Sequence, residues 1–271
     1  MATAQAPAPV ERMRWWQSDL ADLAAVRRLL DETGAEVVYH LAGAVSGAPD
    51  LELVPPTLAS QLVTAVHLLQ AVTERRCHRL VLAASLEEPR GRAERATPTS
   101  PYGAAKAAAG AYARMFHALY GTPVVVLRPF MTYGPRQPER RLVSHVIGAF
   151  LKGEAPALTS GRRRMDWVYL DDVIDGFLGA ALRPGIDGLG IDLGSGRAIS
   201  IRKVVRTIAA LMGTSIRPAW GALPDRPAGP ARVADVAAAR AALGWTPVTA
   251  LEDGLARTVD WYRKWEARTQ P

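Results

Sequence analysis

The chain has 271 residues, of which 49% are hydrophobic and 22% are charged, and its formal net charge is +7. This length is enough to bury a substantial core in one large domain or two. No apolar run reaches the roughly 18 residues that a membrane helix needs. The single cysteine, Cys77, rules out an internal disulfide, and no Cys/His spacing resembles a metal site. We therefore expect a cytoplasmic protein with neither a bound metal nor a membrane partner.

The predicted secondary structure alternates between strands and helices, which is typical of a parallel sheet covered by helices on both faces. Residues 1–12 are rich in Ala and Pro and lack the apolar stretch of a signal peptide, so we expect a disordered lead-in. The elements that follow are, in chain order, a strand at 13–17, a helix at 20–32, a strand at 36–42, a helix at 57–75, a strand at 79–84, a helix at 102–120, a strand at 123–128, a helix at 142–152, a strand at 167–170, a helix at 173–182, a strand at 189–193, and helices at 201–212, 236–243 and 251–265.

Local signals add detail at three of these elements. Asp19 or Asp22 is expected to cap the first helix, and Asp171-Asp172 to cap the helix at 173–182. Trp15-Trp16 predicts either an aromatic strand packed in the core or an exposed strand edge.

Arginine is concentrated in three short runs, at residues 90–92, 136–141 and 162–164. Arginines on separate loops around a cleft suit a small phosphate-bearing ligand, because the guanidinium group pairs with phosphate through two hydrogen bonds. An arginine-biased surface with solvated charges explains the runs equally well. A nucleic-acid site would gather its basic residues and interleaved aromatics on one helix or stripe. We therefore do not expect nucleic acid as a partner.

The segment at 100–106, with the sequence SPYGAAK, carries the strongest chemical signal. Tyr102 and Lys106 are four positions apart at the start of a predicted helix, so they lie one turn apart on one face. An ammonium group beside a phenol favours the phenolate, which predicts a pKa of Tyr102 below the usual ~10. Ser85, at the end of a predicted strand, can offer a hydroxyl to the same reacting oxygen. Such groups are suited to moving a proton while a hydride leaves or enters a secondary alcohol or ketone.

Several further motifs accompany this segment in a fixed order. They are Asp19-Leu20, His40-Leu41-Ala42-Gly43, Ala83-Ala84-Ser85, the SPYGAAK segment itself, LRPFMTYGP at 127–135, DWVYLDD at 166–172, DLGSG at 192–196 and LGWTP at 243–247. In this order they resemble the extended short-chain dehydrogenase/reductase family, specifically its sugar-nucleotide epimerase/dehydratase branch. The resemblance runs from Met13 to the C-terminus.

The resemblance implies an α/β fold, with a Rossmann-like doubly wound parallel sheet and a smaller C-terminal α/β substrate-binding domain. The dinucleotide-binding domain would span residues 13–160, with 166–196 returning to it. The substrate-binding part would comprise 140–165 and 197–271.

The resemblance also implies roles for individual residues. Ser85, Tyr102 and Lys106 correspond to the catalytic residues of the family. The cofactor would be NAD or NADP. Its expected contacts are Asp19, Leu20, Leu41, Ala42, Gly43, Gln61, Tyr102, Lys106 and Pro129.

The chain departs from the family at its start. The family begins with a strand, a G-x-x-G-x-x-G loop and a helix, which together cradle the dinucleotide pyrophosphate. No glycine precedes Met13, so we expect an N-terminally truncated sheet that lacks at least roughly 30 residues. Because the missing strand is central in such a sheet, a gap in the core is expected. Either the start is wrongly assigned or the natural chain binds the cofactor poorly or not at all.

Other departures concern the substrate. Leu86 stands where dehydratases of this branch carry an acid, so we discount dehydratase activity. Glu87 or Glu88 is a candidate base near the sugar, and a solvated loop carboxylate is the alternative. Met131 replaces an Asn that usually touches the substrate.

Two arginines complete the expected substrate contacts. Arg164 lies one place before the usual position of an arginine, which Met165 occupies here. Arg226 resembles the arginine that grips the nucleotide diphosphate.

Two hypotheses of function follow. The first is an NAD(P)-dependent oxidoreductase that acts on a nucleoside-diphosphate sugar, as a 4-epimerase or 4-ketoreductase, with Tyr102 as the acid and base. The second is a degenerate, cofactor-free scaffold whose catalytic segment is a relic. In either case the helices at 57–75 and 102–120 are expected to pair with those of a second copy in a homodimer.

Overall fold

Four parallel strands form a sheet in the order β1-β2-β3-β7, and the computed structural model describes residues 13–89, 97–225 and 231–269 around it. The strands are β1 (Val37–His40), β2 (Arg79–Ala83), β3 (Val124–Pro129) and β7 (Gly190–Leu193). Runs such as VVVLRP in β3 are rich in β-branched residues and are buried on both faces, as strands inside a parallel sheet require.

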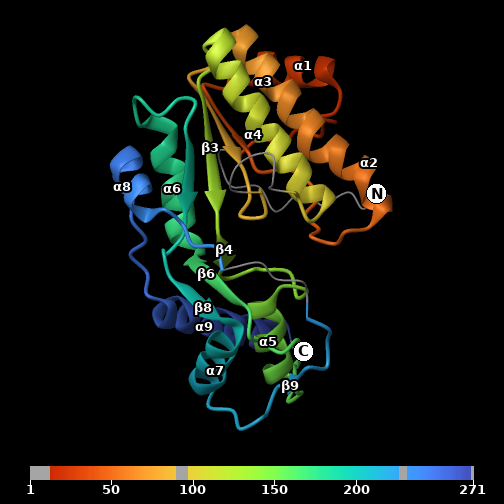
Figure 1. Ribbon diagram of the computed structural model, residues 1–271, viewed down its shortest axis with the longest axis vertical. Coiled ribbons are helices and arrows are strands. Elements are labelled where there is room, and N and C mark those ends of the chain that lie inside the picture. Colours follow the sequence, from red (N-terminus) through yellow and green to blue (C-terminus); the bar gives the residue numbers. More distant parts are fainter. Residues whose placement is uncertain (1–12, 90–96, 226–230, 270–271) are drawn as a thin grey trace.

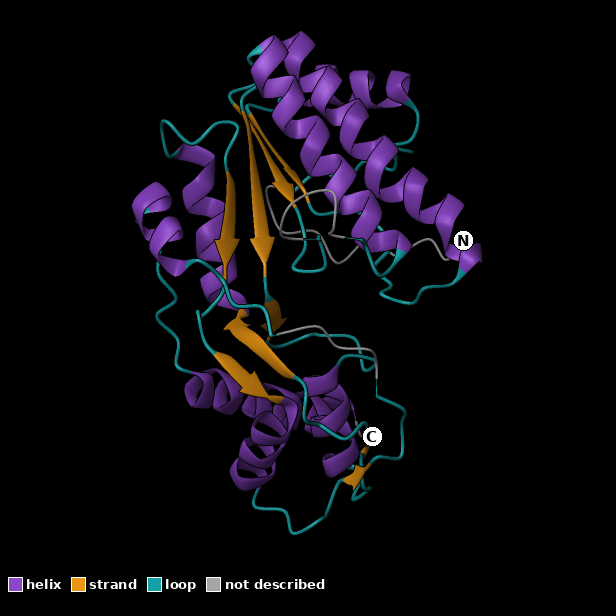
Figure 2. Cartoon of the chain, in the orientation of Figure 1, coloured by secondary structure: helices purple, strands orange, loops and turns teal. Residues whose placement is uncertain are grey.

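Helices cover both faces of this sheet, as Figures 1 and 2 show. One face carries α1 (Leu23–Thr33), α2 (Val54–Thr57), a π-helical turn (Leu58–Val63), α3 (Thr64–Arg75) and α4 (Pro101–Tyr120). The other face carries α6 (Leu170–Leu182) and α8 (Val236–Leu243). Each layer has its own apolar cluster against the sheet. The predicted Rossmann-like α/β class is confirmed.

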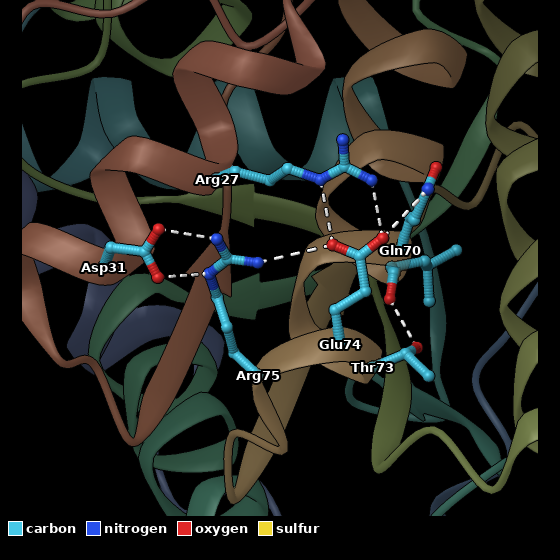
Figure 3. Close-up of polar contacts among 7 residues, drawn as sticks. Arg27, Asp31, Gln70, Thr73, Glu74 and Arg75 are labelled. Atoms are coloured by element: carbon cyan, nitrogen blue, oxygen red, sulfur yellow. Dashed lines mark hydrogen bonds and ion pairs between the residues drawn. The ribbon is translucent and has the colours of Figure 1, made fainter.

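On the first face, ion pairs join helices α1 and α3, as Figure 3 shows. Arg27 of α1 reaches Glu74 of α3 at 2.6 Å, and Arg75 of α3 reaches Asp31 of α1 at the same distance. These side chains are between 24% and 61% exposed, so solvent weakens the pairs, which orient the two helices more than they stabilise the fold.

A second lobe lies beyond the carboxyl ends of the strands (Figure 1). Its sheet has the order β4-β6-β8 and is covered by three helices, and a small separate pair of strands flanks it. The elements are β4 (Met131–Tyr133), α5 (Leu142–Leu151), β5 (Ala157–Leu158), β6 (Arg164–Tyr169), β8 (Ala198–Ser200), α7 (Ile201–Met212), β9 (Ala219–Trp220) and α9 (Leu251–Thr269). Within the predicted returning segment 166–196, α6 and β7 join the parallel sheet, whereas β6 pairs with β4 and β8.

The strand predicted at 13–17 is wrong, because these residues form irregular structure. Trp15 and Trp16 are 53% and 40% exposed, so they do not pack in the core. The indole nitrogen of Trp16 donates a hydrogen bond to Glu32 at 3.1 Å. The first helix starts at Leu23, with Asp22 rather than Asp19 as its cap. Alternating apolar residues alone do not make a strand when no neighbouring strand pairs with them.

The predicted gap in the core does not lie between the described strands of the parallel sheet. The four strands of the parallel sheet are consecutive neighbours, and β1 pairs directly with β2. Among the described strands, β1 and β7 lie at the two edges of the sheet, and Tyr39 on β1 is 37% exposed.

The expected capping role of Asp171-Asp172 is wrong as well. The helix begins at Leu170, and its cap position is Tyr169, so both carboxylates lie inside the first turn. Asp172 is buried and accepts hydrogen bonds from the backbone nitrogens of Val248 and Thr249. It therefore anchors the segment that leads into α9. None of the helices in the described parts of the chain is both long and apolar enough to cross a bilayer.

Candidate active site

Tyr102 and Ser85 meet at the carboxyl edge of the parallel sheet. Ser85 follows β2, and Tyr102 lies in the first turn of α4. The helix begins there because Pro101 suits its first position and the Ser100 hydroxyl accepts a hydrogen bond from the Gly103 nitrogen at 3.1 Å. The Ser85 side chain lies close enough to the Tyr102 phenol to lower the pKa of that phenol. Two groups that are distant in the sequence are thus joined at one point.

Lys106 lies one helical turn beyond Tyr102. Its ammonium is 6.0 Å from the centre of the Tyr102 ring and donates a hydrogen bond to the Ala83 carbonyl at 2.6 Å. Only 5% of the residue is exposed. Burial lowers the pKa of Lys106 to about 8, and the negative charge of Glu88 opposes that shift. The structure therefore places all three predicted catalytic residues together.

The pKa of Tyr102 is raised, not lowered as the Tyr–Lys spacing predicts. Burial is the main cause, and the charges of Glu87 and Glu88 raise it further. The hydrogen bond with Ser85 and the charge of Arg141 act in the opposite direction. The expected effect of Lys106 is missing because its ammonium is turned to the Ala83 carbonyl of β2. Tyr102 in this state is a proton donor.

Glu87 lies at the same edge. Its carboxylate accepts a hydrogen bond from the Ser100 hydroxyl at 3.2 Å, and its backbone nitrogen donates to Ser85 Oγ at 3.2 Å. A side chain in place of Gly47 would come within 2.9 Å of this carboxylate. Glu87 is thus packed between α4 and the loop after β1 rather than freely solvated.

The loop after β1 carries three of the residues that are predicted to contact the cofactor. Leu41, Ala42 and Gly43 are exposed, and Gly43 has a φ of 131° that other residues rarely adopt. A Cβ on Gly43 would overlap the Gln61 amide, which lies on the π-helical turn and donates to the Ala44 carbonyl at 2.6 Å.

Gln61 is 1% exposed, yet its Oε1 is the buried side-chain acceptor without a partner in the described part of the chain. An unsatisfied buried oxygen is costly and needs an explanation, and a partner that binds there is one. Together with the glycine cradle and the exposed loop, it fits the nicotinamide half of a dinucleotide. For the pyrophosphate half of the dinucleotide, the described residues offer no matching element, because among them no glycine-rich turn leads into a helix beside β1.

Three other predicted cofactor contacts are more scattered. Asp19 is exposed and accepts a hydrogen bond from the Ala21 nitrogen at 2.9 Å. The Leu20 carbonyl is 3.2 Å from a ring nitrogen of His67 on α3. Pro129 ends β3 on the same edge as Ser85.

His40, at the end of β1, was not predicted to have a role, and it is buried close to Lys106. Burial, together with the nearby ammonium, lowers the pKa of His40 to about 4. The imidazole is thus neutral at physiological pH, and it lies 3.3 Å from the Thr64 hydroxyl.

A pocket of about 730 Å³ opens in the second lobe beside this edge. Arg141 lines it, and the positive charge of Arg141 lowers the pKa of Tyr102, whereas Ser85, Tyr102 and Lys106 are not among the lining residues. In the sequence, this pocket was indicated by the arginine runs at 136–141 and 162–164. The polar and aromatic lining residues are Arg140, Arg141, His145, Thr159, Ser160, Arg162, Arg163, Arg164, Trp167 and Asp225.

The predicted substrate residues are placed differently from one another. Met131 lines this pocket. Arg164 also lines it, but its guanidinium donates twice to the Ala198 carbonyl, at 2.6 and 3.2 Å. Arg226 lies outside the described residues, between Asp225 and Ala231, which both border the pocket.

The chain belongs to the NAD dependent epimerase/dehydratase family, whose sequence profile matches residues 2–187. This agrees with the class that the parallel sheet and the Ser85–Tyr102–Lys106 group define. The predicted resemblance, and NAD as the cofactor of the family, are confirmed.

Individual relatives are similar over most of their length. A UDP-glucuronate 4-epimerase of Thermodesulfobacterium geofontis is 26% identical over 94% of this chain and 80% of its own. A dTDP-glucose 4,6-dehydratase of Xanthomonas campestris is 30% identical over 91% of this chain and 78% of its own. The crystal structure of a UDP-glucose 4-epimerase of Thermotoga maritima with UDP-glucose superimposes with a TM-score of 0.83 at 25% identity, over 93% of this chain and 84% of that one.

Proposed function

We propose that this protein is an NAD-dependent 4-epimerase or 4-ketoreductase of a nucleoside-diphosphate sugar. The observation that carries the proposal is the juxtaposition of Ser85 after β2, Tyr102 in the first turn of α4 and the buried Lys106, in a chain that also has an arginine-lined pocket. The family and its UDP-sugar relatives support the substrate class.

Bound NAD supplies the chemistry of accepting a hydride from the sugar C4 and returning it. Tyr102 takes the proton of the C4 hydroxyl when the sugar is oxidised and gives a proton back when the ketone is reduced. Ser85 holds the same sugar oxygen through its hydroxyl. Because burial favours the neutral phenol, the phenolate depends on Ser85, Arg141 and the Lys106 ammonium for its stability.

The arginine-lined pocket is the proposed place of the nucleoside diphosphate. Arg140, Arg141, Arg162 and Arg163 line it with positive charge, and guanidinium groups pair well with phosphate oxygens. Arg226 is proposed as a further diphosphate contact. The sugar would then extend from this pocket toward Tyr102, on whose phenol the charge of Arg141 acts.

Dehydration is not expected, although a dehydratase is among the relatives. Loss of water across C5 and C6 needs a general acid at the sugar, and Leu86 follows Ser85 where dehydratases of this branch carry one. Glu87 is proposed as a substrate contact, because its carboxylate is close to Tyr102 and is held there by Ser100.

The test combines calorimetry with product analysis. Purified protein is titrated with NAD and NADP, and is then incubated with NAD and UDP-glucose, UDP-glucuronate or dTDP-glucose. We expect NAD binding and a 4-epimer or reduced product of the sugar. A product that has lost water would overturn the exclusion of dehydratase activity. Absence of both NAD binding and turnover would support the scaffold hypothesis instead.

A homodimer through α3 and α4 is part of the proposal. The two helices pack against each other, and α4 exposes Tyr112, Leu119 and Tyr120. Light scattering after size-exclusion chromatography should give twice the mass of the chain. A monomer at micromolar concentration would contradict this assembly.

A further inference from the structure

The loop that carries Ser85 is closed by one of its own side chains. The Ser85 backbone nitrogen donates a hydrogen bond to Glu88 Oε1 at 3.0 Å, and the Glu88 nitrogen donates to the Ser85 carbonyl at 3.2 Å. The Glu87 nitrogen donates to Ser85 Oγ. Glu88 is buried, with 7% of its surface exposed. The position of the Ser85 hydroxyl thus depends on where the Glu88 carboxylate lies.

Glu88 is in turn held by the ends of two strands. Its Oε2 accepts a hydrogen bond from Arg128 Nε of β3 at 3.1 Å. Arg128 also donates to Asp192 of β7 at 3.2 Å. A buried carboxylate that loses its cation is strongly disfavoured. This chain of ion pairs therefore fastens the Ser85 loop to the rigid sheet.

The other side of the loop is held from far along the chain by Arg232. Its Nη1 donates to the Leu86 carbonyl at 2.8 Å and to the Glu88 carbonyl at 2.5 Å. Arg232 is 144 residues from Glu88 in the sequence, and it directly follows Ala231, which lines the arginine-lined pocket.

The segment at 231–235 is itself anchored at two points. The Ala234 nitrogen donates to Asp166 Oδ2 at 2.9 Å, and the Asp235 nitrogen donates to Asp192 Oδ2 at 3.2 Å. Asp166 also accepts from the backbone nitrogens of Ser195 and Gly196, so the DWVYLDD and DLGSG motifs meet here. At its other end, Ala231 lines the pocket.

We propose that Arg232 is a positioning residue, which ties the Ser85 loop to the segment bordering the arginine-lined pocket and so holds the Ser85 hydroxyl against Tyr102. The role in turnover rests on the proposed function. Arg232 touches the loop carbonyls and not the reacting atoms, so it acts on the hydrogen bond to the sugar oxygen only through Ser85. Ligand contacts in the pocket and alignment of the hydroxyl are then coupled through one side chain.

Hydrogen exchange tests the contact without any need for turnover. In Arg232→Ala, peptides that contain the hydrogen-bonded amides of Ser85, Glu87 and Glu88 should exchange at least ~5-fold faster, because local opening becomes easier. Peptides from β3 should be unchanged. Arg232→Lys should restore most of the protection, since its ammonium can donate to both carbonyls. Arg240→Ala, at an exposed position on α8, is the matched control. Unchanged exchange in Arg232→Ala would overturn the proposal whatever the activity.

Steady-state kinetics test the consequence. Arg232→Ala should lower kcat by about 10-fold or more, while the KM for the sugar nucleotide and the Kd for UDP change less than about 3-fold. In a Ser85→Ala background the same substitution should cost little more, because the two residues act as one unit. A large loss of UDP affinity, or additive losses in the double variant, would contradict action through Ser85. If Arg232→Ala exchanges faster than the wild type but the wild type shows no turnover, the proposed function is refuted and the contact of Arg232 with the Ser85 loop is confirmed.

Discussion

The Lys106 ammonium donates a hydrogen bond to the Ala83 carbonyl over 2.6 Å, which fastens the first turns of α4 to the end of β2. The same contact lies directly beneath the meeting point of Tyr102 and Ser85. The relative positions of Tyr102 and Ser85 thus depend on the buried ammonium of Lys106. Loss of its proton should change both the free energy of unfolding and the enzymatic activity.

Tyr102→Phe should abolish turnover with the fold intact. The substitution removes the only atom that exchanges a proton in the proposed step, and such groups contribute about 10²–10⁴-fold to the rate. Product formation from the sugar nucleotide is measured beside circular dichroism. Tyr112→Phe, at an exposed position on the same helix, is the control and should keep full activity. Full activity of Tyr102→Phe would refute the catalytic assignment.

Lys106 should make the protein more stable as the pH rises from 8 to 10.5. Its pKa is about 8 in the folded chain, below its usual 10.5, so the unfolded chain binds more protons in this interval. The cost of the buried charge is fully present below pH 8 and amounts to about 3 kcal/mol. Urea unfolding of wild type and Lys106→Met at several pH values should show this rise only in the wild type.

The control for that experiment is Lys152→Met, because Lys152 is exposed after α5. Its pH dependence should follow the wild type. If Lys106→Met and the wild type gain stability in parallel between pH 8 and 10.5, the ammonium of Lys106 is not buried in solution.

His40 should make the protein sensitive to acid. Its pKa is about 4 in the folded chain, below its usual 6.5, so the unfolded chain takes up the proton first. The free energy of unfolding therefore carries no penalty from His40 above pH 6.5, and it falls by about 3 kcal/mol as the pH drops to 4. His40→Gln should lose less stability over this range in denaturant titrations. His78→Gln, at an exposed site, should behave like the wild type.

Gly254→Ala should destabilise the second lobe. A Cβ at this position of α9 would overlap the Tyr133 hydroxyl, which donates to the Leu251 carbonyl at 3.2 Å, and would come within 2.9 Å of Tyr169. Overpacking of this kind costs about 1–3 kcal/mol. Thermal unfolding measures the loss.

Gly148→Ala provides the opposite expectation. This glycine lies in α5, and no atom is within 4 Å of the position where a Cβ would lie. Replacing a helical glycine by alanine in open space stabilises by roughly 0.5–1 kcal/mol. Equal effects of the two substitutions would show that α9 does not pack on Tyr133 as described.

Much of the site could be predicted from local sequence. Tyr102 and Lys106 are four residues apart in a helix with a clear cap, so their common face follows from the helical repeat alone. The position of Ser85 at a strand end, and the arginine runs that line the pocket, were also recognisable. The strand at 13–17 was not, because strand formation depends on pairing partners that the local pattern does not contain.

The sequence by itself determined the order of strands and helices, the α/β class and the Tyr–Lys segment, because these depend on periodicity and caps within short stretches. Only the tertiary structure decided the direction of the Tyr102 pKa, the burial of His40, and the contacts of Glu88 with Arg128 and of Arg232 with the Ser85 loop. Burial and long-range charge depend on which segments the fold brings together, and Arg232 and Glu88 are joined across more than half of the chain.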